Sequence, residues 1–255
     1  NPSGAARMVA EGALVGVAAA LAVHMDPTQP AGGVGVRSGP LTSATDAVTI
    51  SVEGRSGHSG RPFLCHDAIV AAADVVRAMH ALVGQRVNPL AAAVLNFGRI
   101  HGGDAPNVIA DLVVLEGVLR TLDADARKVL QAEVPAVAAA AAAVWGCTTT
   151  TRLVSGAPSV INDAWLGRIV EDAAVDVVGA ARVRPLLAPS TGAEDFGFFG
   201  EVVPQYMMRV GCGIGGASVA HLHTPEFDID ESALHVATRV MGRAVLRASA
   251  ERPPI

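Results

Sequence analysis

The sequence has little cysteine, little charge and no long apolar run. Its 3 cysteines, Cys65, Cys147 and Cys212, lie far apart, and no two of them form a CxxC pair. This usage excludes a disulfide framework and a zinc knuckle. It predicts instead free thiols in a protein of the reducing cytoplasm.

Charged residues make up only 17% of the chain, whereas hydrophobic residues make up 51%. This balance excludes a disordered chain, and 255 residues are enough for one large domain or two smaller ones. The net charge is −5 and the pI is near 5.9. We therefore expect no nucleic acid and no membrane surface as a partner, because binding to phosphates requires a basic face.

No stretch of roughly 20 apolar residues occurs, so the sequence predicts no transmembrane helix. Alanine-rich runs such as 136–144 raise the apolar content, but alanine is above all a helix former. The first residues lack the pattern of a secretory signal peptide, and Asn1 rather than methionine opens the chain. We expect a processed or partial chain.

The most informative stretch lies near the C-terminus, over residues 219–231. It contains His221 and His223, then Pro225, and then an acidic run that leads into a helix pattern. An imidazole held by a rigid turn at the end of an element is typical of a metal site. We interpret His223 as the metal ligand and His221 as its neighbour. The carboxylates of residues 228–231 are interpreted as first-turn residues favoured by the helix dipole.

The order of predicted elements indicates two kinds of domain. Residues 44–155 are predicted as β-α-β-β-α-β, the order of a ferredoxin-like domain. Residues 1–43 and 156–255 alternate helix and strand, as an α/β layer does. The predicted fold is therefore one discontinuous α/β domain that is interrupted by an inserted ferredoxin-like domain. Open edge strands of that insertion would suit pairing with a second copy.

Local patterns give finer expectations for single elements. The apolar run 15–24 is predicted as a strand that ends at His24, with a turn over 25–27. Asn162 is predicted to cap a helix over 163–178, and Val245 to face inward from the closing helix 231–248. In the helix that Asp67 caps, the predicted apolar face is formed by Ile69, Val70, Ala73, Val76 and Leu82.

Three further features could carry chemistry. His24 lies at the end of a predicted strand, where ligands bind in open α/β sheets. His58 lies in a glycine-rich loop, with Asn107 in a second loop, and Glu194 lies in the turn 192–196. Each has a structural alternative: a lone histidine is often a satisfied structural group, Glu194 could cap a helix, and His58 could be a turn tip.

Taken together, these features resemble the metal-dependent amidohydrolases of the aminoacylase and carboxypeptidase type, and most of all the hippurate and auxin-conjugate hydrolases. Eight matching stretches occur in order along essentially the whole chain. These stretches are 6–14, 23–27, 57–62, 100–103, 107–111, 116–121, 192–196 and 223–227.

The resemblance implies a zinc-exopeptidase-like catalytic domain with a ferredoxin-like lid, which would also form a homodimer. It implies hydrolysis of the amide bond in an N-acyl-amino acid or a short peptide-like substrate. Two divalent cations (Zn, Mn, Co or Ni) would polarise the carbonyl and activate water, and a glutamate would move the proton. His24 and His223 would each ligate one of the two metal ions.

The resemblance also implies roles for the remaining candidates. His58, from the lid of a partner subunit, would stabilise the oxyanion of the tetrahedral intermediate. Asn107 and Arg120 would hold the carboxylate or carbonyl of the substrate, since arginine offers a bidentate fork. Glu194 would support the metal site without touching the substrate.

The chain lacks several residues of the family pattern. The acidic pair of general base and ligand would immediately precede Asn1, and two further ligands would lie upstream of it. We therefore expect this chain to be the C-terminal two-thirds of such an enzyme. One alternative is a truncated homologue that folds and dimerises without turnover, and a weaker one is a plain ferredoxin-like binding module. Phe63 and Ala110 replace the usual His and Pro of relatives, which should be tolerable.

Overall fold

The computed structural model describes residues 3–214 and 222–251, which fall into two units. Unit 1 comprises Asn1–Thr42 and Val160–Ile255, and unit 2 comprises Ser43–Ser159. The sequence predicted the insertion at 44–155, close to the range of unit 2.

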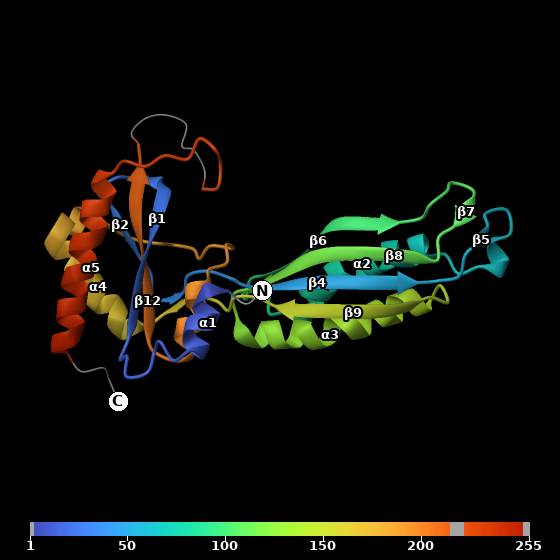
Figure 1. The fold of residues 1–255 in the computed structure, drawn as a ribbon, viewed down its shortest axis with the longest axis horizontal. Helices are drawn as coiled ribbons and strands as arrows, with labels where there is room; N and C mark the ends of the chain where they lie inside the picture. The colour runs from blue at the N-terminus through green and yellow to red at the C-terminus, as the bar shows by residue number, and fades with distance from the viewer. Residues whose placement is uncertain (1–2, 215–221, 252–255) are drawn as a thin grey trace. The chain divides into compact units, whose positions relative to one another are not determined.

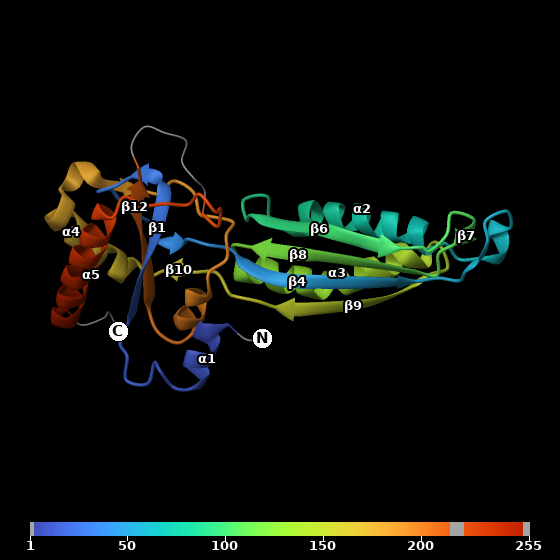
Figure 2. The ribbon, with the colours of Figure 1, turned by 45° about the horizontal axis from the view of Figure 1, so that its top comes forward.

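Unit 2 is built from a four-stranded sheet and two long helices. The sheet order is β6-β8-β4-β9, and every neighbouring pair is antiparallel. Helices α2 and α3 cover one face of this sheet (Figures 1 and 2). The main elements follow the β-α-β-β-α-β order, and a short β5–β7 pair precedes β8. Their bounds are β4 Ala44–Glu53, β5 Gly57–His58, a 3₁₀ turn Pro62–Leu64, α2 Ala68–Arg86, β6 Ala93–Gly102, β7 Val108–Ile109, β8 Leu112–Thr121, α3 Ala124–Ala143 and β9 Thr148–Ser155.

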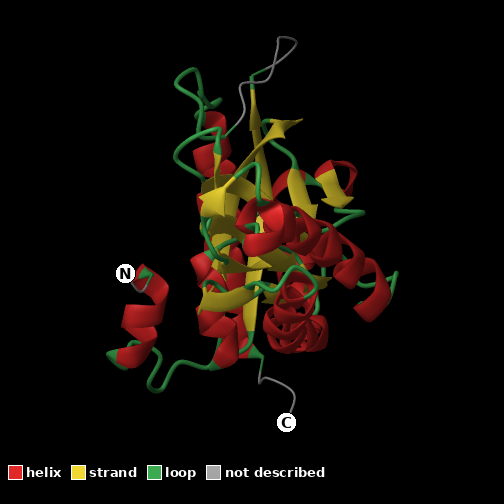
Figure 3. Ribbon diagram, turned by 90° about the vertical axis from the view of Figure 1, so that its right-hand side faces the viewer, coloured by secondary structure: helices red, strands yellow, loops and turns green. Residues whose placement is uncertain are grey.

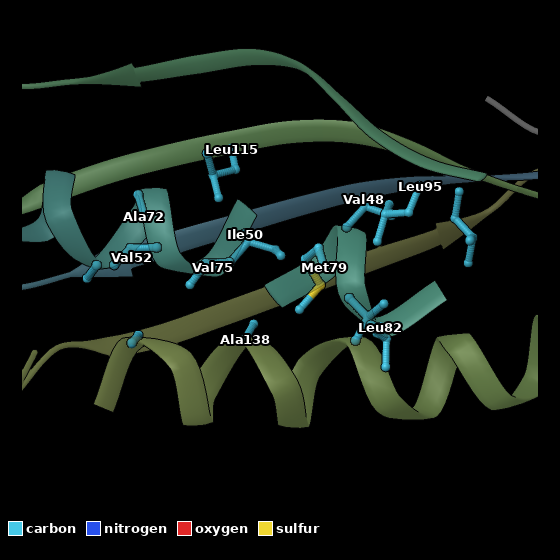
Figure 4. Packing of buried hydrophobic residues seen from close by; sticks show 14 of the residues in the cluster. Val48, Ile50, Val52, Ala72, Val75, Met79, Leu82, Leu95, Leu115 and Ala138 are labelled. Atoms are coloured by element: carbon cyan, nitrogen blue, oxygen red, sulfur yellow. The ribbon is translucent and has the colours of Figure 1, made fainter. Parts of the chain in front are cut away.

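The core of unit 2 lies between the sheet and its two helices. Strand β4 alternates as its sequence predicts, because Val48, Ile50 and Val52 are all buried while the intervening residues are not. Figure 4 shows these side chains packed against Val75 and Met79 of α2. The alternation in β4 therefore places its three large apolar side chains in one core.

The predicted apolar face of α2 was largely wrong. The buried residues are Ala68, Ala71, Ala72, Val75, Met79 and Leu82. By contrast, Ile69 is 48% and Val70 is 37% exposed. The helix carries apolar residues on most of its circumference, so periodicity alone does not fix which side faces inward. Its alanines allow a close approach to the sheet, which the larger side chains would prevent.

Among the described residues, α2 is also the one helix long and apolar enough to cross a membrane by length and composition. The sequence analysis predicted no such segment. In the structure, the buried side of α2 packs into the core of unit 2.

Unit 1 contains a second four-stranded sheet, in the order β1-β12-β2-β11. Strands β1 and β12 run parallel and side by side (Figure 1), as do β2 and β11, while β2 and β12 are antiparallel. Figure 3 shows helix α1 joined to the sheet by an irregular segment. The bounds are α1 Gly4–Ala10, β1 Ala20–Pro30, β2 Val34–Val36, β3 Gly39–Pro40, β10 Ile161–Asn162, α4 Ala164–Val178, a 3₁₀ turn Ala180–Arg182, β11 Val183–Pro185, a 3₁₀ helix Asp195–Glu201, β12 Gln205–Gly213 and α5 Ser232–Ala250.

Strand β1 differs from its prediction at both ends. Val15 is 85% exposed, and Gly16 has a φ of 75°, which breaks the apolar run before the strand begins. The predicted turn at 25–27 is instead part of the strand, because Met25 and Asp26 pair with β12 and Pro30 pairs with it again after an irregularity. Backbone pairing with a neighbouring strand thus outweighs the local turn signal.

Two predictions about helix ends and faces in unit 1 were also wrong. The N-cap of α4 is Asp163, whose Oδ1 accepts from the Leu166 N–H at 3.0 Å, rather than Asn162. The buried Asn162 amide donates to the carbonyls of Arg37 and Met207 at 2.8 and 2.9 Å, and accepts from the Met207 N–H at 2.8 Å. An amide can both donate and accept, which a carboxylate cannot do. In α5, Val245 is 47% exposed, and Ala244 is buried in its place.

The single tyrosine of the chain, Tyr206, lies in the core of unit 1. It is 1% exposed, and its hydroxyl oxygen accepts from the Arg37 N–H at 3.0 Å. Burial raises the pKa of Tyr206 to about 12, and the negative charge of Glu171 also raises it. The hydrogen bond from the Arg37 N–H lowers the pKa, but by less. The folded state therefore favours the neutral phenol.

We predict that Tyr206 will titrate about 2 pH units higher in the folded chain than in denaturant, where a free tyrosine has a pKa of about 10. Because the folded pKa lies above the unfolded one, this group contributes stability fully below pH 10 and loses it as the pH rises through 12. Absorbance of the phenolate near 295 nm measures this titration for one residue alone, and circular dichroism monitors folding. A midpoint near pH 10 with intact circular dichroism would contradict the buried position.

Candidate functional site

One face of the sheet in unit 1 is polar midway along two paired strands, β1 and β12. Side chains of Met208 and Val210 on β12 pack toward α4 and α5, so Arg209 between them faces the opposite way. His24 pairs with Arg209 in the parallel ladder, so the two side chains share this face, and Asp26 follows two residues further along β1. A cation, an imidazole and a carboxylate thus gather on one face of this strand pair. The predicted position of His24 at a strand end was wrong, because β1 continues to Pro30.

The ring of His24 is oriented by a backbone carbonyl. Its Nδ1 lies 2.7 Å from the carbonyl oxygen of Met25. A carbonyl can only accept, so Nδ1 carries the proton and the lone pair of the neutral ring is on Nε2. This is the arrangement in which a histidine presents one nitrogen to a metal ion while the other is held by a hydrogen bond.

A cavity of about 310 Å³ lies beside this polar face. Asp26 and Arg209 line it, as does Leu222, the residue before His223. Apolar side chains form most of the remaining wall: Leu41, Leu186, Ala188 and Pro189. The structure therefore brings the chain neighbours of both predicted metal ligands to one pocket.

Asp26 is engaged within its own turn. Its Oδ1 accepts from the backbone N–H and the hydroxyl of Thr28 at 3.0 and 2.5 Å, and its Oδ2 accepts from the Gln29 amide at 2.8 Å. These three hydrogen bonds fix the carboxylate at the end of β1. Asp26 acts on the pocket mainly through its charge.

Arg209 is a site residue that the sequence analysis missed. Burial lowers the pKa of its guanidinium, whereas the charges of Asp26 and Glu194 raise it. The signal was present in the sequence, since residue 209 is the one charged residue in the otherwise apolar run 205–213. A charged side chain in a buried strand is uncommon without a partner or a function.

The two carboxylates of the acidic turn 194–195 make different interactions. Asp195 Oδ2 accepts from the Ala5 N–H at 3.1 Å and so holds the N-terminal helix α1. Glu194 precedes the 3₁₀ helix without a side-chain cap hydrogen bond, and its charge acts on Arg209. This places Glu194 beside the polar face, while its supporting role remains a prediction.

His223 has an unusual backbone. Its φ is 68°, and it is the one non-glycine residue with positive φ among residues 3–214 and 222–251. Such a conformation costs free energy in a non-glycine residue and is often found at functional sites. Its side chain is exposed, and the predicted neighbour His221 lies outside the described residues. In the acidic run, Asp230 Oδ1 accepts from the Ser232 N–H at 2.9 Å just before α5. The first turn of α5 itself contains no acidic residue, so the prediction of first-turn carboxylates was wrong.

In unit 2, the structure brings His58 and Asn107 together. The pair β5–β7 joins their loops, with His58 opposite Val108, and the Ser59 N–H donates to the Asn107 carbonyl at 3.1 Å. Nδ1 of His58 accepts from the Gly60 N–H at 2.9 Å, so the proton of the neutral ring is on Nε2. The side chain is exposed, which leaves the Nε2–H available as a donor.

Arg120 lies far from this pair. It is at the carboxyl end of β8, opposite Thr45 and Val94, whereas Asn107 precedes the amino end of the same strand. With a rise of about 3.3 Å per residue, the eight steps from Leu112 to Arg120 span roughly 25 Å. One copy of unit 2 therefore does not present Asn107 and Arg120 to the same group.

The donor set for a metal is partial. Imidazole nitrogens suit Zn, Co and Ni, and His24 has a suitable tautomer. However, the described part of the chain contains no group of three or more His, Cys, Asp or Glu side chains placed to hold a metal ion. The residues present include the kind of donor that such an ion requires, but too few of them to hold it.

These features define an α/β protein with a candidate ligand site on one face of the β1–β12 pair. Residues 1–247 match the model of peptidase family M20/M25/M40, and the chain belongs to this family. It is 39% identical over 232 residues to Probable hydrolase sll0100 of Synechocystis sp., covering 91% of the chain and 59% of that protein. It is 33% identical over 234 residues to N-acetyl-L-cysteine deacetylase of Bacillus subtilis, covering 91% of the chain and 54% of the deacetylase.

A solved structure shows the same fold. The Bacillus subtilis YXEP protein, described as a dinuclear metal-binding peptidase of the M20 family, superposes with a TM-score of 0.77 at 27% identity. The match covers 98% of this chain and 62% of that one. The chain thus spans little more than half the length of the relatives it matches.

Proposed function

We propose that the protein to which this chain belongs hydrolyses the amide bond of N-acyl-amino acids with the aid of bound divalent metal ions. The observation that carries the proposal is His24, whose Nδ1–H is bound to a backbone carbonyl and whose Nε2, which has no partner among the described residues, lies beside a pocket. Membership of the M20 family and the deacetylase relative support the same reaction class.

In this proposal, His24 and His223 each ligate one of two metal ions, of which Zn, Mn, Co and Ni are the candidates. Such ions polarise a carbonyl and activate water. The remaining acidic ligands and the general base would lie outside the 255 residues. Glu194 would help to fix the charge pattern around the site through Arg209.

Unit 2 would serve as a ferredoxin-like lid that also forms a homodimer. Strands β6 and β9 are the outer strands of its sheet, so each offers one free edge for pairing with a second copy. His58 of one subunit would donate its Nε2–H to the oxyanion in the site of the other subunit. This tautomer is the one that such a donor requires.

Substrate recognition by the lid would then involve two copies of unit 2. Arg120 lies near the carboxyl end of β8 and Asn107 precedes the amino end of that strand, so they could hold one substrate together only if different subunits supply them. The narrower assignment to hippurate and auxin-conjugate hydrolases stays a prediction. A cytoplasmic location is part of the proposal, and all three cysteines are free thiols.

The test is an amide-hydrolysis assay on the protein with any residues that precede Asn1, and on the 255-residue chain alone. With N-acetyl-cysteine and N-benzoylglycine as substrates, we expect turnover by the longer protein that a chelator removes and added Zn, Mn or Co restores. For the 255-residue chain alone we expect no turnover with any of these ions. Turnover by neither protein would instead favour a homologue that folds and dimerises without catalysis, which the partial donor set among the described residues also suggests.

A further inference from the structure

The guanidinium of Arg209 lacks a partner in the part of the chain that the structure describes. No hydrogen bond or ion pair of its side chain is present there, although burial removes it from much of the solvent. A guanidinium has five N–H donors, and Arg209, which is half-buried, lines the cavity beside β1. An acceptor from a ligand would pair with these donors.

The two nearby carboxylates do not pair with these donors. Asp26 is occupied by its hydrogen bonds to Thr28 and Gln29, and neither Asp26 nor Glu194 forms an ion pair with Arg209. Both act on the guanidinium only through space. They hold it in its charged form and leave its donors directed to other groups.

The walls of the cavity define the ligand further. Its volume of about 310 Å³ is at the lower end of the range for small-molecule sites. Apart from Asp26, Ser190 and Arg209, its lining is apolar. Such a cavity is complementary to a small apolar group that carries a single negative charge.

We propose that Arg209 is a specificity-determining residue that binds the free carboxylate of an N-acyl-amino acid whose side chain or acyl group is apolar. A guanidinium can bind a carboxylate through two parallel N–H···O bonds. The charges of Asp26 and Glu194 disfavour a second negative charge in the pocket, so a carboxylate is preferred to a phosphate dianion. This inference rests on the proposed function and names its substrate class.

The first experiment compares two substrates in the full protein, with and without the substitution Arg209→Gln. For N-acetyl-methionine, we expect Arg209→Gln to lower kcat/KM by about 10–100-fold, mainly through KM, because a charge-assisted hydrogen-bond pair is lost. For the corresponding amide, which lacks the carboxylate, we expect a change of less than about 3-fold. Arg209→Lys should restore part of the selectivity, and Arg184→Gln on the exposed side of β11 is the matched control.

The second experiment is independent of catalysis. Calorimetry measures the binding of 4-methylpentanoate, an apolar monocarboxylate, and of 3-methylbutyl phosphate to both proteins. The proposal expects the wild type to prefer the carboxylate, and expects Arg209→Gln to weaken carboxylate binding at least about 10-fold.

The outcomes separate the two proposals. Absence of turnover with every amide would refute the proposed function, while the calorimetry would still decide the role of Arg209. Equal carboxylate binding by the wild type and Arg209→Gln would overturn this inference. An equal loss of turnover on acid and amide would also overturn it, because that result indicates a structural role.

Discussion

Replacing His58 with alanine is expected to lower kcat by about 10²–10³-fold, the usual effect of removing one oxyanion donor. The reason is the tautomer. The Gly60 N–H occupies Nδ1 at 2.9 Å, so the exposed Nε2–H is the donor that a developing oxyanion would meet. KM should change little, since the interaction strengthens only in the transition state. Steady-state kinetics of the full protein on an N-acyl-amino acid measures both constants.

Two variants make the His58 result specific. His80→Ala removes another exposed histidine of unit 2, on α2, and should leave kcat unchanged. His58→Gln retains an N–H donor and should recover part of the lost rate. If His58 acts in the site of a second subunit, mixing His58→Ala with His24→Ala protein should restore activity that neither has alone. Unchanged kcat in His58→Ala would refute the oxyanion role.

Elements with strong local signals could be predicted from the sequence. Asp67 caps α2 as expected, because a carboxylate before an apolar helical run accepts from the free N–H groups of the first turn. Asp123 caps α3 in the same way. The alternation in β4 likewise follows from burial of one face of the sheet. In both cases the residue and its neighbours in sequence contain all the information that is needed.

Features that depend on distant partners could not be predicted. Asn162 has the chemistry of a helix cap, yet its amide bridges Arg37 and Met207, which only the folded sheet brings to it. The strand β1 continues through a proline-containing turn signal because β12 provides hydrogen bonds. Sequence periodicity contains no information about such partners.

The candidate site also contains features that the sequence could predict and features that it could not. His24 was identified from a predicted strand end, although β1 in fact continues to Pro30, and its tautomer required the Met25 carbonyl. Arg209 was missed because its significance comes from lying beside His24 in the parallel ladder. The separation of Asn107 from Arg120 also appears only in the structure, where Asn107 precedes the amino end of β8 and Arg120 lies near its carboxyl end.

The largest expected loss of stability follows the removal of Arg127 from unit 2. Its Nε and Nη2 donate to the two carboxylate oxygens of Asp46 at 2.9 and 2.6 Å, and Nη2 also lies 3.3 Å from the Gly156 carbonyl. The Asp46 side chain is only 1% exposed, and that of Arg127 is 16% exposed. Arg127→Ala would leave a buried carboxylate without its counter-charge, so we expect unfolding of unit 2 to become easier by about 3–5 kcal/mol.

A variant with one tryptophan can report the unfolding of unit 2, and an exposed ion pair can serve as the control. Trp145 and Trp165 are the 2 tryptophans and lie in different units, so in a Trp165→Phe background the fluorescence of Trp145 follows unit 2 alone during denaturant unfolding. Arg99→Ala is the control, because the Arg99–Glu116 side chains are 72% and 45% exposed and such pairs contribute at most about 1 kcal/mol. Since the cost arises from the orphaned charge, Asp46→Ala combined with Arg127→Ala should be less destabilised than Arg127→Ala alone. Equal losses for Arg127→Ala and Arg99→Ala would show that burial does not set the strength of the Asp46 pair.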